Sequence, residues 1–189
     1  MHELLNYDEQ RMLLKLAREA IQTALNGEKI LPLDLNLFSE TLRENGASFV
    51  TLTKHGNLRG CIGTLEPHQP LAEDVREHAI AAAMHDYRFH PVEEKELPEL
   101  LIEISRLTIP ATLFFSNPED LLDKLHVGED GVILSDGFRR ATFLPQVWSK
   151  IPEKSQFLSQ LCIKMGSPPD YWKSEDIKVF TYRVEDFHE

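Results

Sequence analysis

The sequence predicts an α+β fold, in which a largely antiparallel sheet is flanked by helices. Two pairs of short segments rich in β-branched and apolar residues are each joined by a glycine-containing turn, which is the pattern of a β-hairpin. Segments with helical periodicity separate these hairpins, without the steady strand–helix alternation of a parallel sheet. The 189 residues suit one domain or two closely packed subdomains.

The first helix is expected at residues 7–26, where apolar residues recur at steps of three and four. Asn6 can cap its start with Glu9 three residues later, and Gly27 can end it. A later helix contains an alanine-rich run at 79–83, so it is thin enough to lie close to a sheet. The further elements are expected as strands 48–53 and 58–64, helix 71–85, strand 100–107, helix 118–125, strands 131–135 and 139–143, helix 153–165 and strand 177–184.

Composition excludes several classes of function. The formal net charge of −11 argues against a general nucleic-acid binder, because such a protein needs a basic face to replace phosphate counterions. The N-terminal segment lacks the pattern of a signal peptide, and no apolar stretch approaches the ~20 residues of a membrane span. Two cysteines far apart in the sequence are typical of a reduced, cytoplasmic protein.

The stretch LRGCIG at 58–63 places two glycines and a thiol in a predicted strand. By the two-residue period of a strand, Arg59, Cys61 and Gly63 share one face. A nearby guanidinium favours the thiolate, and Gly63 is expected to leave open space beside the thiol. The alternative is a buried cysteine beside glycines that let strand and helix pack tightly. Both interpretations stay open at this point.

The strand LLIEISRL places Glu103 and Ser105 on one face. A carboxylate in so apolar a strand needs a partner or water, and Arg59 or Arg88 could supply the partner. A structural ion pair and a role in a binding site are equally compatible with this pattern.

No known metal or phosphate-binding motif is present. His78 and His85 share a helix face, but seven residues separate them by about 10.5 Å along the axis, too far to hold one metal. The sequence has no Cys–His signature of a peptidase and no glycine-rich phosphate loop. We therefore expect no metal site, and the sequence names no cofactor.

Five segments, taken in order, resemble the AMMECR domain family, whose microbial members are named AmmeMemoRadiSam system protein A. They are GASFVTLTKHGNLRGCIGTLEP, PLAEDVREHAIAAAMHDYRF, ELPELLIEISRL, GVIL and TFLPQVW, and LRGCIG is the family's hallmark hexapeptide. The resemblance runs over residues 46–180. One departure is Tyr87, where the family often has proline.

The resemblance implies an α+β fold of two subdomains that flank a cleft lined by the hexapeptide. It also implies a shared system with Memo-like and radical SAM proteins, although the family has no settled activity. The first hypothesis is an enzyme or enzyme component that acts on a small molecule or peptide. The second is a non-catalytic binding or adaptor module that uses the same cleft. The candidate catalytic residues are Cys61 and Glu103, and the candidate ligand-binding residues are Arg59, Gly60, Gly63, Arg88 and Ser105.

Overall fold

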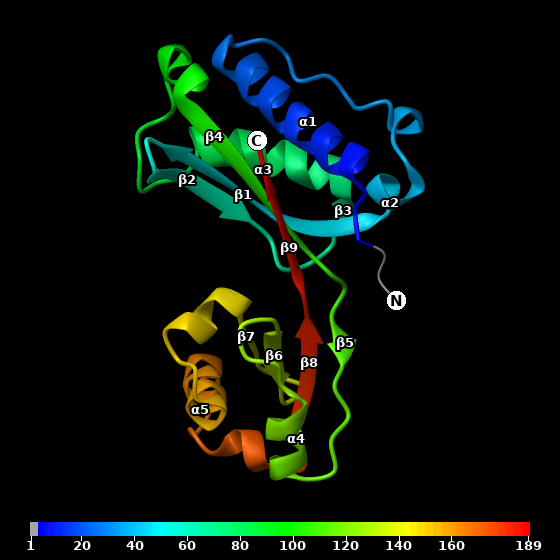
Figure 1. The fold of residues 1–189 in the computed structure, drawn as a ribbon, viewed down its shortest axis with the longest axis vertical. Helices are drawn as coiled ribbons and strands as arrows, with labels where there is room; N and C mark the ends of the chain where they lie inside the picture. Colours follow the sequence, from blue (N-terminus) through cyan, green and yellow to red (C-terminus); the bar gives the residue numbers. More distant parts are fainter. Residues whose placement is uncertain (1–3) are drawn as a thin grey trace. The chain divides into compact units, whose positions relative to one another are not determined.

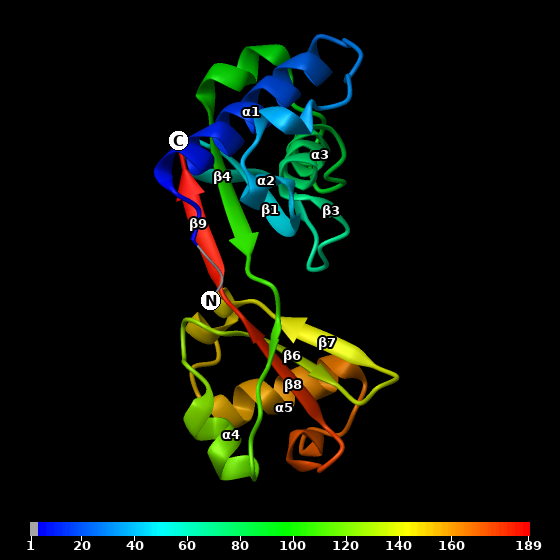
Figure 2. The ribbon, with the colours of Figure 1, turned by 90° about the vertical axis from the view of Figure 1, so that its right-hand side faces the viewer.

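The computed structural model describes residues 4–189, which divide into two compact units (Figures 1 and 2). The first unit contains the residues up to Leu107 together with Glu185–Glu189, and the second is Thr108–Val184. Each unit has its own antiparallel sheet and its own apolar core. The predicted α+β class is confirmed, but the β-structure forms two sheets where we expected one. That the units flank a cleft stays a prediction.

The first unit contains a sheet with the strand order β2-β1-β4-β9, and β3 pairs with β1 outside this path. Helices α1 and α3 pack together, and α3 also contacts β1 and β2. The elements are α1 (Tyr7–Leu25), a 3-10 turn (Leu35–Leu37), α2 (Glu40–Arg43), β1 (Asn45–Lys54), β2 (Asn57–Gly63), β3 (Gln69–Pro70), α3 (Leu71–Met84), a 3-10 helix (Glu94–Glu99), β4 (Leu100–Leu107) and β9 (Val184–His188).

Helix α1 begins where the sequence predicts. The side chain of Asn6 accepts a hydrogen bond from the amide of Glu9, and the carboxylate of Glu9 accepts one from the amide of Asn6. This capping box satisfies two amides that the helix itself leaves without partners. Gly27, with φ +67°, follows the last turn. Among residues 4–189, no helix has both the length and the apolar character that a bilayer crossing requires.

The contact between α3 and β2 depends on small residues. Ala79, Ala82 and Ala83 are buried, and they let the helix axis approach the sheet. A Cβ atom at Gly60 would overlap the carbonyl oxygen of Ala82. The predicted close packing of this alanine-rich helix is therefore confirmed, and Gly60 is the strand residue that permits it.

The second unit contains a sheet with the strand order β5-β8-β6-β7 and helix α5 packed on β6 and β7. Its core includes Trp148 stacked on Phe157 at 3.6 Å between ring centroids, with the buried thiol of Cys162 in the same cluster. The elements are β5 (Ala111–Thr112), α4 (Pro118–Lys124), β6 (Gly131–Ser135), β7 (Arg140–Phe143), a 3-10 helix (Pro145–Ser149), α5 (Lys154–Met165), a 3-10 turn (Tyr171–Lys173) and β8 (Lys178–Tyr182).

The predicted strand at 177–184 is wrong in its extent. The structure has β8 at Lys178–Tyr182, and after Arg183 the chain continues as β9 at Val184–His188, which pairs with β4 of the first sheet. The sequence prediction missed β9 because its acidic residues are poor strand formers. Pairing compensates for this low propensity, since the amide of Glu189, just beyond β9, donates to the carbonyl oxygen of Ile102 in β4.

We predict that Gly60→Ala lowers the free energy of unfolding by roughly 1–3 kcal/mol, because the new methyl group displaces the α3 backbone at Ala82. Urea denaturation at pH 7 measures this change. Leu58→Ala, at an exposed position of the same strand, is the control and should change stability much less. Equal effects of the two substitutions would contradict the packing role of Gly60.

Candidate functional site

Three neighbouring strands bring Cys61, Thr51 and Glu103 into one row. Thr51 of β1 lies opposite Cys61 of β2 on one side and opposite Glu103 of β4 on the other. The adjacent residues Val50 and Leu52 fill the core beneath α1 and α3. Since side chains alternate along a strand, the row lies on the sheet face away from these helices. The residues of this row, Cys61, Thr51 and Glu103, are called the Cys61 row below.

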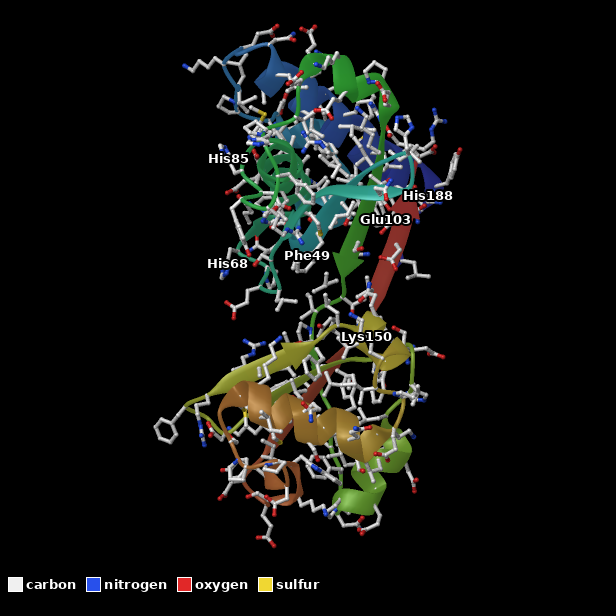
Figure 3. All side chains as sticks on the ribbon, turned by 90° about the vertical axis from the view of Figure 1, so that its left-hand side faces the viewer. Phe49, His68, His85, Glu103, Lys150 and His188 are labelled. Carbon is white, nitrogen blue, oxygen red and sulfur yellow. The ribbon has the colours of Figure 1, made fainter. Side chains whose placement is uncertain are left out.

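A second row, parallel to the first, contains Gly63, Phe49 and Ser105. Figure 3 labels Phe49 and Glu103 on the sheet of the first unit. A Cβ atom at Gly63 would overlap the ring of Phe49 and the carbonyl oxygen of Ser48. The predicted open space at Gly63 is therefore wrong, because an aromatic ring from the neighbouring strand occupies it. Ser105 is buried at the other end of this row.

The thiol of Cys61 is half-buried and unpaired with another cysteine. The hydroxyl group of Thr51 donates a hydrogen bond to Sγ over 3.3 Å. The Cys61 row thus combines a thiol, a hydroxyl group and a carboxylate.

Side chains from the segment after α3 hold the backbone of Cys61. The amide of Cys61 donates to Oδ2 of Asp86 over 2.9 Å, and Nη2 of Arg88 donates to the carbonyl oxygen of Cys61 over 3.2 Å. Asp86 is buried, and its nearest oxygen lies 2.6 Å from Nη2 of Arg88. The Arg88 guanidinium, helped by the amides of Cys61 and Arg88, holds the pKa of the Asp86 carboxyl well below its usual range. This pair takes the place of a neighbouring strand at the outer edge of β2.

Arg59 is bound within the fold in the same way. Its Nε and Nη2 atoms donate to both carboxylate oxygens of Glu96, over 3.2 and 3.0 Å, and Nη1 donates to the carbonyl oxygen of His90. The guanidinium of Arg59 and the amide of Glu93 lower the pKa of Glu96 to about 2. The Phe89 ring lies within 6.0 Å of the guanidinium of Arg59 and 5.5 Å of that of Arg88.

The predicted ion pair of Glu103 with Arg59 or Arg88 is wrong. These arginines pair with Glu96 and Asp86, which lie close to them in the segment after α3. Within the part of the chain that the structure describes, the half-buried carboxylate of Glu103 has no hydrogen bond or ion pair to the protein. Its charge is thus available to a ligand or to water.

Sequence reasoning missed four residues around the site. Two of them could have been found from the sequence. Thr51 follows from pairing the two strands of the predicted hairpin, and Asp86 follows from its place two residues before Arg88. No sequence signal indicated Glu96 or His188. The hydrogen bond from the Glu189 amide to the Ile102 carbonyl brings the preceding His188 beside the strand that carries Glu103 (Figure 3). Among residues 4–189, no group of three or more His, Cys, Asp or Glu side chains could hold a metal ion.

We predict that Asp86→Asn lowers the free energy of unfolding at pH 7 by about 2 kcal/mol, because the buried carboxylate accepts hydrogen bonds from Arg88 and from the Cys61 amide. Since the folded-state pKa is lowered, this stabilisation is present above the ordinary pKa of 3.8 and is lost as the pH falls towards the folded-state value. Urea denaturation between pH 7 and pH 3 should show the deficit shrinking with acidity. The exposed Asp123→Asn is the control, and a deficit independent of pH would refute the assignment.

Comparison with known proteins agrees with this architecture. The AMMECR1 family model matches residues 14–187. A protein of Methanothermobacter thermautotrophicus is 41% identical over 186 residues, with 98% of this chain and 96% of that protein covered. The protein MJ0810 of Methanocaldococcus jannaschii is 36% identical, with coverage of 98% and 92%. The crystal structure of the uncharacterized protein PH0010 from Pyrococcus horikoshii is 36% identical, with a TM-score of 0.77 and coverage of 98% and 93%. This chain therefore belongs to the AMMECR1 family.

Proposed function

We propose that this chain is an enzyme component that binds a small polar molecule or a peptide along the Cys61 row. The observation that carries the proposal is the alignment of a half-buried thiol, a hydroxyl group and an unpaired carboxylate across three adjacent strands. Cys61 is the reacting group. A half-buried thiol and an unpaired carboxylate in one place are typical of sites that move protons or form bonds.

The spacing of the strands limits what Glu103 can do. Cys61 and Glu103 are two strands apart, so their Cα atoms are separated by roughly 10 Å. Among residues 4–189, no hydrogen bond joins the Glu103 carboxylate to the Cys61 thiol, so Glu103 does not accept the thiol proton in this arrangement. It acts on the far end of a ligand that lies across Thr51.

A second candidate function is a binding or adaptor module without catalysis. The arrangement around the arginines favours it, because Arg59 and Arg88 use their donors on Glu96, Asp86 and backbone carbonyl groups. A site that held an anionic substrate through these arginines would first have to break these contacts.

We also propose that the chain acts with Memo-like and radical SAM proteins in the cytoplasm. The family membership supports the first part of this proposal. The two free cysteines support the second, because thiols stay reduced in that compartment. Purification from the source cells, followed by mass spectrometry of co-purifying ligands and proteins, tests both parts. Recovery without either class of partner would count against the shared system.

We predict that a thiol-directed reagent labels Cys61 in the folded protein at least about tenfold faster than Cys162. Cys61 is half-buried, whereas Cys162 is fully buried and burial raises the pKa of its thiol. Peptide mass spectrometry over a labelling time course measures both rates, and the urea-unfolded protein supplies the reference. Equal, slow labelling of the two thiols in the folded state would eliminate the reactive role of Cys61.

We predict that Cys61→Ser abolishes turnover of a ligand identified by co-purification but keeps its binding within a few-fold, since serine preserves size and hydrogen bonding. Calorimetry and a product assay on the same variant measure the two quantities. Glu103→Gln should weaken binding of a ligand with a donor group and leave the rate of thiol labelling unchanged. Turnover that survives in Cys61→Ser would support the adaptor function instead.

A further inference from the structure

Arg11 on α1 differs from the arginines of the hexapeptide region. Those arginines donate to buried or half-buried carboxylates, as the pairs of Arg59 with Glu96 and of Arg88 with Asp86 illustrate. Within residues 4–189, the guanidinium of Arg11 makes no hydrogen bond to the protein and lies over the ring of Tyr7, 5.6 Å from its centre. Its donors are therefore available to a ligand.

Arg11 belongs to a basic stripe along α1. Arg11, Lys15 and Arg18 recur at intervals of four and three residues, so their side chains lie on one side of the helix. Beside this stripe is a hollow of about 470 Å³ between α1 and the C-terminal end of β9, which lie next to one another in Figure 2. Tyr7 and His188 also line the hollow. Its volume falls within the range of small-molecule sites.

The charges in the hollow do not cancel. Among residues 4–189, Glu189 is the one carboxylate residue that lines the hollow, and its side chain is bound by Arg18, which also donates to the carbonyl oxygens of Leu97 and Leu100. The ammonium of Lys15 lies 3.7 Å from Glu19, in a pair that is 76% and 64% exposed. Such an exposed pair contributes little, so Lys15 can turn towards a ligand. Of the residues 4–189 that line the hollow, Arg11, Lys15 and Arg18 are cationic, and Arg11 is the one among them without a carboxylate partner.

We propose that this hollow binds a small phosphate monoester. The phosphate accepts hydrogen bonds from the guanidinium of Arg11 and from the ammonium of Lys15, and its organic group lies along the exposed ring of Tyr7. A planar guanidinium matches phosphate geometry, and a second cation suits a group that carries nearly two negative charges. The site is separate from the Cys61 row and needs neither Cys61 nor Glu103.

Isothermal titration calorimetry with phenyl phosphate on the full chain tests the proposal. We expect saturable binding at low ionic strength, weakened roughly tenfold or more by Arg11→Gln and several-fold by Lys15→Gln. Arg43→Gln is the matched control, because Arg43 is also exposed, without a hydrogen bond to the protein among residues 4–189, and lies outside the hollow. Thermal unfolding followed by circular dichroism verifies that all three variants keep the fold.

Two further probes define the ligand class. Inorganic phosphate should bind more weakly than phenyl phosphate because it makes no contact with Tyr7, and benzoate should bind more weakly because it carries a single charge. The absence of phenyl phosphate binding up to millimolar concentration would overturn the site. Equal losses in Arg11→Gln and Arg43→Gln would do the same, and equal binding of benzoate would overturn the phosphate class.

Discussion

The carbonyl oxygen of Ala82 lies where a side chain at residue 60 would begin, and much of the first unit depends on this close approach. This close approach sets the distance between α3 and β2. It therefore also sets where the C-terminal end of α3 lies relative to β2. Asp86 follows two residues after α3 ends, and its carboxylate meets the amide of Cys61. A bulkier residue at position 60 would move both helix and carboxylate away from the strand.

Charge then fastens the segment after α3 to the hairpin. Both carboxylates, Asp86 and Glu96, are largely buried, whereas the Arg88 side chain is 43% exposed, and backbone amides donate hydrogen bonds to each carboxylate. Geometry of this kind compensates for the cost of removing the charges from water. These contacts cover the outer edge of β2, which would otherwise present unpaired backbone groups to other chains.

On α1, by contrast, an arginine has no acidic partner among residues 4–189. There the guanidinium of Arg11 has no carboxylate to neutralise it, and the adjoining hollow keeps an excess of cations. The chain thus uses arginine in two ways, since one set builds the strand edge around Cys61 and the other is exposed to a potential ligand. A net charge of −11 conceals this local surplus, because net charge describes the whole surface and not a single hollow.

Local patterns alone determined the helices, most of the strands, the Asn6 capping box and the face shared by Cys61 and Arg59, because these follow from the period of a helix or a strand. The tertiary structure decided which strands are neighbours, and this aligned Cys61 with Thr51 and Glu103, paired each arginine with an acid other than Glu103, and placed β9 beside β4. Such contacts join residues distant in sequence, so they depend on register and packing that no local pattern records.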